Sequence, residues 1–230
     1  MTSVVIVAAG RGTRMGPDID KLFLEVAGRP VVAHTWARWD ASAEVDEIVL
    51  VIRAGLEPSF TEMAATLPLT KPYRFAVGGA ERQDSVWNGL AALRADAELV
   101  AIHDGARPCV SPELIRQTIA AARASGAAVA AQRITDTLKE SDDGALITRT
   151  VDRAKLWSVQ TPQVFRVAVI RAAITTARAR GLNLTDDTAA CELIGQPVRL
   201  VESRQPNPKV TVPADLPFIA SVLAGPPCPA

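Results

Sequence analysis

The sequence predicts an α/β protein with a Rossmann-like, mainly parallel twisted sheet, helices on both faces of the sheet and a protruding β-arm. Short apolar and β-branched runs recur along the chain, and most are separated by stretches with helical periodicity. This alternation is typical of parallel sheets that helices cover on both faces. One polar, turn-rich stretch interrupts the alternation and predicts the arm.

Six runs predict the strands of the sheet, because each is rich in aliphatic residues and bounded by polar or turn residues. They cover residues 4–8, 48–52, 74–77, 99–103, 127–131 and 198–201. The segment 111–126 predicts a helix with both ends marked in the sequence. Ser111 suits the N-cap, Pro112 the first helical position and Gly126 the C-terminal stop.

The β-arm is predicted over residues 133–157. Two strand-like runs, TDTLKE and ALITRTV, flank a turn of serine, aspartates and glycine at 141–144. A two-stranded arm is marginally stable alone in water, so we expect it to pack against something, and a second subunit is a reasonable candidate. Homodimerisation is therefore a hypothesis of the sequence.

Size and composition favour one domain. The chain has 230 residues and is 48% hydrophobic, enough for one substantial α/β domain over residues 1–224 that includes the arm, with a flexible tail at 225–230. Lysines and arginines number 25, as do the acids, so we expect no nucleic-acid partner and no membrane partner. Any lysines and arginines that bind phosphate must therefore be gathered at one site rather than spread over the surface.

Cysteine usage and apolar runs bear on localisation. The three cysteines are odd in number and far apart, which fits neither a disulfide framework nor a cysteine-based zinc site. The first strand begins by residue 3 and no apolar run approaches the length of a membrane span. We therefore expect a cytoplasmic protein.

The glycine loop after the first strand predicts a polyphosphate site. Residues 5–16 read VIVAAGRGTRMG, in which Gly10 and Gly12 can adopt a positive φ that turns successive backbone N–H groups into one anion-binding concavity. Arg14 and Lys21 add cationic donors suited to phosphate. The alternative is a tight turn with solvated arginines around it.

Two commoner glycine loops do not match. A dinucleotide-binding fingerprint would need glycine where Met15 stands, and an acid where Arg53 follows the second strand. An ATPase P-loop would need a lysine and a hydroxyl residue after Gly16, where Pro17 follows instead. Dinucleotide binding is disfavoured and the P-loop is excluded.

The segment 77–86, VGGAERQDSV, has two interpretations. Backbone groups freed by the paired glycines, together with the Ser85 hydroxyl, could bind the polar edge of a pyrimidine base. Alternatively, Asp84 or Ser85 simply caps a helix that begins near Val86. The sequence leaves both open.

The segment 102–108, IHDGARP, ends a buried strand with charged residues. Asp104 could organise Mg²⁺ or its waters near phosphates, or orient a substrate hydroxyl. His103 could be a base, but a hydrogen-bonded structural histidine is the better interpretation. With two histidines and no metal-ligand pair among them, we assign no metal ligand to the protein.

Four further charged residues are ambiguous. Arg153 and Lys209 stand in apolar or turn-like surroundings and could hold a second anion, although single exposed cations are usually just solvated. The pair Asp186–Asp187 follows Thr185, a candidate N-cap, where carboxylates favour the helix dipole without any catalytic task. We take the capping role as the better interpretation for these acids.

Nine motifs in one order give the chain a family resemblance. They are AAGRGTRM, the segment 17–21, GGAERQDSV, HDGARP, TDTLK, TVDRAKLW, QTPQVF, LTDDTAACEL and NPKVT. With them the chain strongly resembles the 2-C-methyl-D-erythritol 4-phosphate cytidylyltransferases over residues 3–220. The resemblance implies a Rossmann-like nucleotidyltransferase domain, a homodimer built with the arm, Mg²⁺ held mainly by the CTP phosphates, and a role in non-mevalonate isoprenoid synthesis.

The resemblance also implies three sets of site residues. The catalytic residues would be Arg14, Lys21, Arg153 and Lys209. The nucleotide-binding residues would be Ala8, Ala9, Gly10, Gly12, Gly79, Ser85, Asp104 and Gly105. The residues that bind the acceptor, methylerythritol phosphate, would be Asp104, Arg107, Thr137, Arg153, Thr161 and Lys209. Thr137 and Arg153 would reach the site from the neighbouring subunit.

Two positions depart from the family pattern. Gly105 stands where many members carry alanine, and Ala80 where some carry aspartate, so pyrimidine selectivity is the property in question. The nearest alternatives are a ribitol 5-phosphate cytidylyltransferase or another sugar-phosphate nucleotidyltransferase. An alternative of another class is a non-catalytic nucleotide-binding regulatory module.

Overall fold

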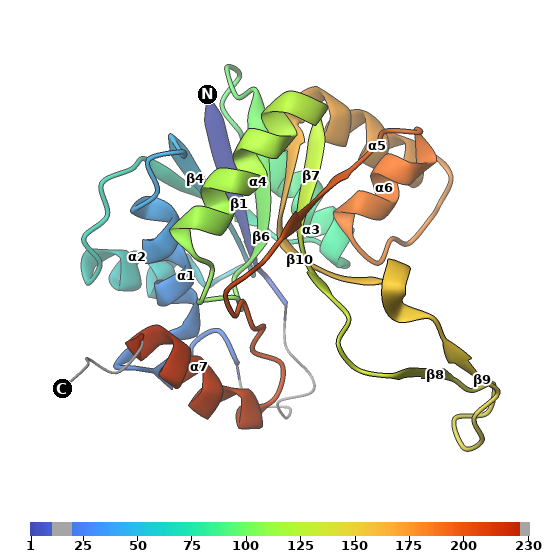
Figure 1. The fold of residues 1–230 in the computed structure, drawn as a ribbon. Coiled ribbons are helices and arrows are strands. Elements are labelled where there is room, and N and C mark those ends of the chain that lie inside the picture. The colour runs from blue at the N-terminus through green and yellow to red at the C-terminus, as the bar shows by residue number, and fades with distance from the viewer. Residues whose placement is uncertain (11–19, 226–230) are drawn as a thin grey trace.

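A seven-stranded sheet forms the centre of the computed structural model, which describes residues 1–10 and 20–225 (Figure 1). Its strand order is β11-β7-β10-β6-β1-β4-β5. The strands are β1 (Thr2–Ala8), β4 (Glu47–Ile52), β5 (Tyr73–Val77), β6 (Leu99–Asp104), β7 (Ala127–Arg133), β10 (Trp157–Arg166) and β11 (Arg199–Glu202). Strand β10 runs antiparallel to β6 and β7, and the other neighbouring pairs are parallel, which confirms the predicted fold class.

Helices cover both faces of the sheet. One face carries α1 (Val31–Asp40), α2 (Glu57–Ala65), α4 (Pro112–Ser125) and α7 (Leu216–Ala224), and Figure 1 shows α4 in front of the strands. The other carries α3 (Arg82–Ala91), α5 (Val167–Ala179) and α6 (Asp187–Leu193).

The alternation of side chains along β1 explains the two layers. Val4 and Ile6 belong to the apolar cluster under α1 and α4, whereas Val5 belongs to the cluster under α3 and α5. Successive residues of a strand point to opposite faces. Because both faces are buried, the strand is a continuous apolar run, as is usual in parallel sheets.

Helix α4 has the predicted ends. The Leu114 N–H donates to the Ser111 hydroxyl at 3.2 Å, and Gly126 closes the helix with a φ of 90°. Gly126 adopts this left-handed conformation without the penalty that a Cβ would bring.

Strand β10 was not predicted. Pro162 lies within it, and polar Gln160, Thr161 and Gln163 interrupt its apolar pattern. The pairing register with β7 shifts between Val159 and Gln163, so the ladder is irregular where the proline falls.

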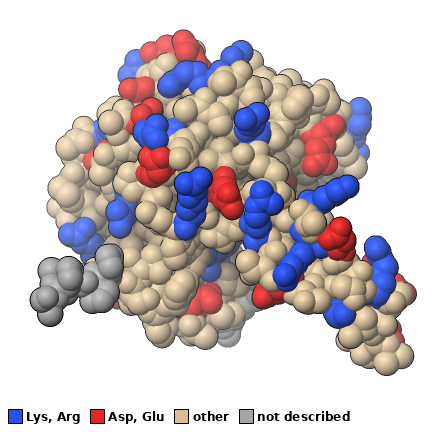
Figure 2. Space-filling view, viewed as in Figure 1, with Lys and Arg blue, Asp and Glu red and all other residues tan. Residues whose placement is uncertain are grey.

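The arm is a β-hairpin at the predicted place. Strands β8 (Leu138–Glu140) and β9 (Arg149–Val151) pair antiparallel, and the hairpin projects from the body (Figures 1 and 2). It leaves and re-enters the sheet where Arg133 of β7 pairs with Trp157 of β10. Near its tip, Leu146 is 73% exposed.

Short elements complete the described chain. Strands β2 (Glu25–Val26) and β3 (Arg29–Pro30) form a small hairpin before α1. Single 3₁₀ turns occupy Arg153–Lys155 in the arm and Pro213–Asp215 before α7. In residues 1–10 and 20–225, no helix is both long enough and apolar enough to cross a membrane.

Helix α3 lies unusually close to the sheet at Gly89. A Cβ on Gly89 would stand 2.5 Å from Cγ1 of Val5 and 2.8 Å from Cγ2 of Val51. These distances are too short for real contacts between carbon atoms, so glycine sets the spacing between α3 and the sheet.

We expect Gly89→Ala to lower the free energy of unfolding by about 1–3 kcal/mol, because overpacking outweighs the gain in helix propensity. Urea unfolding followed by circular dichroism measures the change. A stabilised variant would contradict the close packing of α3.

Candidate active site

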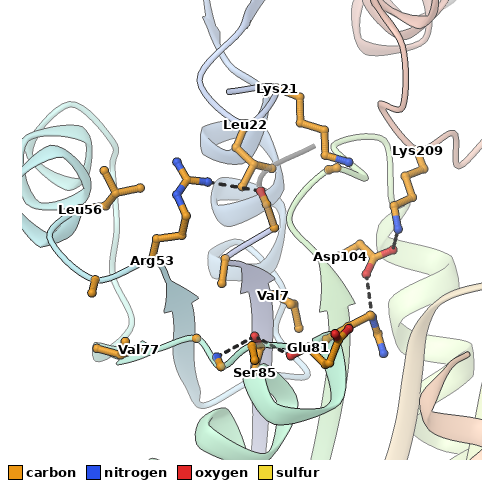
Figure 3. A pocket seen from close by; sticks show the side chains of 18 residues that line it. Val7, Lys21, Leu22, Arg53, Leu56, Val77, Glu81, Ser85, Asp104 and Lys209 are labelled. Atoms are coloured by element: carbon orange, nitrogen blue, oxygen red, sulfur yellow. Dashed lines mark hydrogen bonds and ion pairs between the residues drawn. The ribbon is translucent and has the colours of Figure 1, made fainter. Parts of the chain in front are cut away.

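A cavity of about 670 Å³ opens at the carboxyl ends of β1, β4, β5 and β6 (Figure 3). Its volume is in the range of small-molecule sites. From β1 the chain proceeds to β4 and β5 on one side, whereas β6 lies on the other, and ligands of open α/β sheets bind at such switch points. The predicted site residues that line it are Ala9, Gly10, Lys21, Gly79, Ser85, Asp104 and Lys209.

Two loops meet closely along one wall of the cavity. A Cβ on Gly78 would stand 2.3 Å from the Cβ of Ala9, and one on Gly79 would stand 2.2 Å from the Cβ of Asp84. No side chain fits at either glycine. The loop after β5 therefore packs directly on the loop after β1.

Ser85 fixes the shape of the loop after β5. Its hydroxyl accepts the Gly79 N–H at 3.1 Å and donates to the Glu81 carbonyl at 3.2 Å (Figure 3). The prediction of a helix that starts near Val86 was wrong, because α3 begins at Arg82 with Glu81 as its N-cap. Ser85 therefore lies in the first turns of α3 and holds the glycine loop.

The glycine loop after β1 is described only in part. Gly10 does not have a positive φ, so the left-handed backbone expected there is not found. A Cβ on Gly10 would meet no atom within 4 Å. The predicted residues Gly12 and Arg14 lie outside the described residues.

Asp104 is the carboxylate at the centre of the charged end of the cavity. Its Oδ2 lies 2.6 Å from Nζ of Lys209 and 3.8 Å from Nε of Arg107, and its Oδ1 lies 3.5 Å from Nε of Arg82. Burial opposes its charge, but Arg82, Lys209 and Arg107 outweigh burial and hold the pKa of Asp104 well below its usual range. The carboxylate is ionised at any physiological pH.

Thr161 of β10 and Asn207 hold the segments that carry Asp104 and Lys209. The Asp104 N–H donates to Oγ1 of Thr161 at 3.1 Å, and Nδ2 of Asn207 donates to the Thr161 carbonyl at 2.8 Å. Arg107 donates from Nη1 to the Asn207 carbonyl at 2.7 Å. Thr161 and Arg107 thus hold the segment that carries Lys209, and neither lines the cavity.

Lys21 reaches the same end of the cavity. Its Nζ donates to the Val210 carbonyl at 3.2 Å, and its side chain extends toward the Asp104 end of the pocket, as that of Lys209 does (Figure 3). The two lysines come from opposite ends of the chain.

Ala8 and Gly105 do not line the cavity and pack closely together where β1 and β6 end. Ala8 is buried, and the Gly105 N–H donates to the Val7 carbonyl at 2.9 Å. A Cβ on Gly105 would stand 3.1 Å from that carbonyl oxygen and 3.3 Å from the Cβ of Ala8. An alanine at 105 would require these neighbours to shift by a few tenths of an ångström.

Two further predicted residues also do not line the cavity of their own chain. Thr137 and Arg153 belong to the exposed arm, where Arg153 donates from Nη1 to the Thr135 carbonyl. Neither lines the cavity.

Two cavity arginines were missed by the sequence reasoning. Arg82 pairs with Asp104 and, at 2.8 Å, with Asp187. Arg53 forms an ion pair with Asp20 and donates from Nη1 to the Gly10 carbonyl at 3.3 Å. The sequence held a signal for both. Arg53 directly follows a predicted parallel strand, and Arg82 closely follows the paired glycines 78 and 79.

The acids of α6 also differ from expectation. Asp186, not Thr185, is the N-cap, and its carboxylate accepts the Ala189 N–H at 2.9 Å. Asp187 is 3% exposed and pairs with Arg82, so its role extends beyond the helix dipole.

Cations dominate the charged end of the cavity. Lys21, Arg53, Arg82 and Lys209 line it, against the acids Asp104 and Glu81. Among the described residues, no three His, Cys, Asp or Glu side chains gather to hold a metal ion. The cavity therefore suits an anionic ligand.

His103 is a structural residue. It is fully buried, its Nε2 lies 3.1 Å from the Arg107 carbonyl oxygen, and its ring packs against the Trp39 ring with centroids 5.2 Å apart. Burial lowers the pKa of His103 to about 4, so the imidazole is neutral at pH 7. These contacts confirm the structural interpretation.

A glycine-rich, cation-lined cavity at the carboxyl edge of this sheet defines a nucleotide-binding α/β protein of the nucleotidyltransferase class. The family model of 2-C-methyl-D-erythritol 4-phosphate cytidylyltransferase matches residues 2–224, and the chain belongs to that family. It is accordingly an enzyme, a nucleotidyltransferase of isoprenoid synthesis.

Curated relatives and solved structures agree with the family model. The 2-C-methyl-D-erythritol 4-phosphate cytidylyltransferase of Pelotomaculum thermopropionicum is 42% identical over 222 residues, which cover 96% of this chain and 93% of the relative. The crystal structure of the 4-diphosphocytidyl-2C-methyl-D-erythritol synthase from Anaerococcus prevotii superposes with a TM-score of 0.85 at 33% identity, covering 97% and 96% of the two chains. The Thermus thermophilus cytidylyltransferase gives 0.78 at 38% identity, covering 95% and 96%.

The buried imidazole predicts a pH-dependent stability. Below pH 6.5 the unfolded chain binds a proton at His103 that the folded protein rejects, so folding is progressively destabilised as pH falls from about 6.5 to about 4. We expect His103→Gln to remove about 2 kcal/mol from the loss of unfolding free energy between pH 7 and pH 5, measured by urea unfolding.

The comparison variant is His34→Gln. His34 is half-buried and its pKa is also lowered by burial, so its removal should change the pH dependence less. An unchanged pH dependence in His103→Gln would mean that the folded protein protonates His103.

Proposed function

We propose that this protein transfers the cytidylyl group of CTP to 2-C-methyl-D-erythritol 4-phosphate, giving 4-diphosphocytidyl-2-C-methyl-D-erythritol and pyrophosphate. The observation that carries the proposal is the cavity beside two glycine loops in which Arg82 and Lys209 converge on Asp104 and which Lys21 also lines. A purely regulatory nucleotide-binding module would have no need of Arg153 and Lys209 to hold a second anion.

The reaction is an in-line attack by a phosphate oxygen of the acceptor on the α-phosphorus of CTP. The new oxygen–phosphorus bond forms as the bond to pyrophosphate breaks, and no protein nucleophile takes part. Two unit charges about 4 Å apart repel by roughly 4 kcal/mol at an effective dielectric constant near 20, so the approach of two phosphates must be screened by cations. Lys21 and Arg14 are proposed to stabilise the α-phosphate and the departing pyrophosphate.

The donor is proposed to be the magnesium complex of CTP. Both oxygens of Asp104 face cations, and no three ligating side chains gather among the described residues, so the metal would arrive on the phosphates of the substrate. When bound, Mg²⁺ neutralises charge on the triphosphate.

The glycine loops are proposed to bind the nucleotide. The loop after β1, with Ala8, Ala9, Gly10 and Gly12, would hold the triphosphate and ribose. Gly79, whose N–H is hydrogen-bonded to Ser85, would present its backbone carbonyl to the cytosine edge.

The acceptor is proposed to bind beyond Asp104, between Lys209 and the arm of a second subunit. Arg153 and Thr137 lie on the exposed arm, away from the cavity of their own chain, and the arm exposes Leu146 and Ile147. Both facts support a homodimer in which each arm completes the neighbouring site. Asp104, Arg107 and Thr161 would support this acceptor side.

We also propose a cytoplasmic location. Cys109 and Cys191 are buried and free, which suits a reducing compartment in which CTP is available.

The test of the proposed function is Mg²⁺-dependent release of pyrophosphate from CTP. Methylerythritol phosphate and ribitol 5-phosphate are compared as acceptors, and ATP, GTP and UTP as donors. Release with CTP and methylerythritol phosphate alone supports the proposal. Preference for ribitol phosphate would assign the sister activity, and no release with any acceptor would favour the regulatory module.

We expect Lys21→Ala to lower turnover about 100-fold or more, as removal of one preorganised transition-state donor typically does. Arg14→Ala should behave alike. The control is Lys71→Ala, since Lys71 precedes β5 at the opposite end of the sheet from the cavity. Near wild-type turnover in Lys21→Ala would refute the role of Lys21.

We expect Arg153→Ala to act mainly on the Michaelis constant of the acceptor, because Arg153 is proposed to position the attacking phosphate. Arg149→Ala, a second arm cation that pairs with Glu140, is the control. A lost affinity for CTP with an unchanged acceptor constant would reverse the assignment.

Mixing two impaired variants, assayed at an acceptor concentration far below the Michaelis constant of Arg153→Ala, tests the shared site. A dimer of one Lys21→Ala chain and one Arg153→Ala chain has one intact site if the arm acts in the neighbouring subunit. Equal mixing should then restore about a quarter of wild-type activity, since half the dimers are mixed and each holds one intact site of two. No recovery would place Arg153 in the site of its own chain.

A further inference from the structure

We infer that Asp187 is a positioning residue: it holds the guanidinium of Arg82 inside the cavity, where Arg82 binds a phosphate group of the substrates. The inference rests on the proposed function and deepens it. Asp187 lies at the start of α6, far along the chain from the glycine loops, and it does not line the cavity itself.

Arg82 contacts two carboxylates, and the two contacts differ in strength. Asp187 accepts a hydrogen bond from Nη2 of Arg82 at 2.8 Å, whereas Oδ1 of Asp104 lies 3.5 Å from Nε. The first contact is a charge-assisted hydrogen bond and the second is a looser ion pair. Asp187 is therefore the anchor, and Asp104 is the partner that an arriving phosphate can replace.

Asp187 is buried away from the cavity, whereas Arg82 is partly exposed to it. The side chain of Asp187 is 3% exposed, and that of Arg82 is 30% exposed and lines the cavity. Burial opposes both charges of this pair: it raises the pKa of Asp187, whereas at Arg82 the carboxylates of Asp187 and Asp104 outweigh burial and raise the pKa of the guanidinium above its ordinary value. Arg82 thus presents a permanent positive charge to the cavity.

The anchor is itself fixed to the central sheet. The Asp187 N–H donates to Oε1 of Gln163 at 3.1 Å, and Nε2 of Gln163 donates to the Asp186 carboxylate at 3.0 Å. Gln163 lies in β10, two positions after Thr161, which accepts the Asp104 N–H. One strand therefore supports both carboxylates that face Arg82.

A guanidinium held in this way is oriented before substrate binds. Arginine without its anchor would have many rotamers, and its ordering would cost free energy at the moment of binding. With Asp187 in place, the donor is aimed at the cavity in advance, which is how preorganised groups stabilise developing charge.

Kinetics of Asp187→Asn test the inference. The substitution keeps the size of the side chain and removes its charge, and we expect kcat/KM to fall about 10- to 100-fold, the scale for a misplaced group in an active site. The control is Glu192→Gln, which removes a charge from an exposed position of the same helix that does not line the cavity. It should retain kcat/KM within about twofold.

A double-mutant cycle separates positioning from stability. Arg82→Gln should lower kcat/KM as much as Asp187→Asn or more, and the double variant should be no worse than Arg82→Gln alone, because both changes remove one function. Multiplied losses, or an unaffected Arg82→Gln, would overturn the inference. Asp187→Glu should recover part of the activity, and its failure to exceed Asp187→Asn would also count against positioning.

Binding of the magnesium complex of CTP, followed by calorimetry, makes the test independent of turnover. Weaker binding by Asp187→Asn and by Arg82→Gln supports the inference, whether or not the wild type releases pyrophosphate. Absence of pyrophosphate release by the wild type would contradict only the proposed function. Wild-type activity with unchanged kinetics and binding in both variants would sink the inference alone. If Asp187→Asn does not fold, Arg82→Lys decides, because it keeps the charge and loses the fork that Asp187 orients, and wild-type kcat/KM would then contradict us.

Discussion

The ionised Asp104 carboxylate is the constraint on which the site depends. An acid at the end of a buried central strand is costly to ionise, and it stays charged because cations from three separate parts of the chain converge on it. Lys209 arrives from the C-terminal segment, Arg82 from the start of α3, and Arg107 from the loop after β6. These ion pairs bring remote segments to one edge of the sheet and give the cavity its charge.

The antiparallel strand β10 is the structural support of that arrangement. It lies between β6 and β7, and its irregular middle supplies Thr161 and Gln163, which hold Asp104 and α6. A regular apolar strand at this position would offer no hydrogen-bond partners there. The polar residues that break the pattern of β10 are the ones that connect the sheet to the site.

The sequence predicted what local chemistry determines. β1 was readable from its β-branched run and α4 from Ser111 and Gly126, because these signals depend only on neighbouring residues. β10 was missed because Pro162 and its polar neighbours argue against a central strand. Likewise, motifs located Asp104 and Lys209, but the pairing of Arg82 with Asp187 joins residues 105 positions apart and exists only in three dimensions.

The attachment of the arm has a consequence for how this family can vary. Arg133 and Trp157 are direct register partners on neighbouring strands, and the Arg133 guanidinium stacks 4.4 Å from the centroid of the Trp157 ring. The arm between these two residues therefore leaves the sheet and returns to it at the same place. Evolution can thus lengthen or shorten this excursion, or change its sequence, without moving a strand of the central sheet.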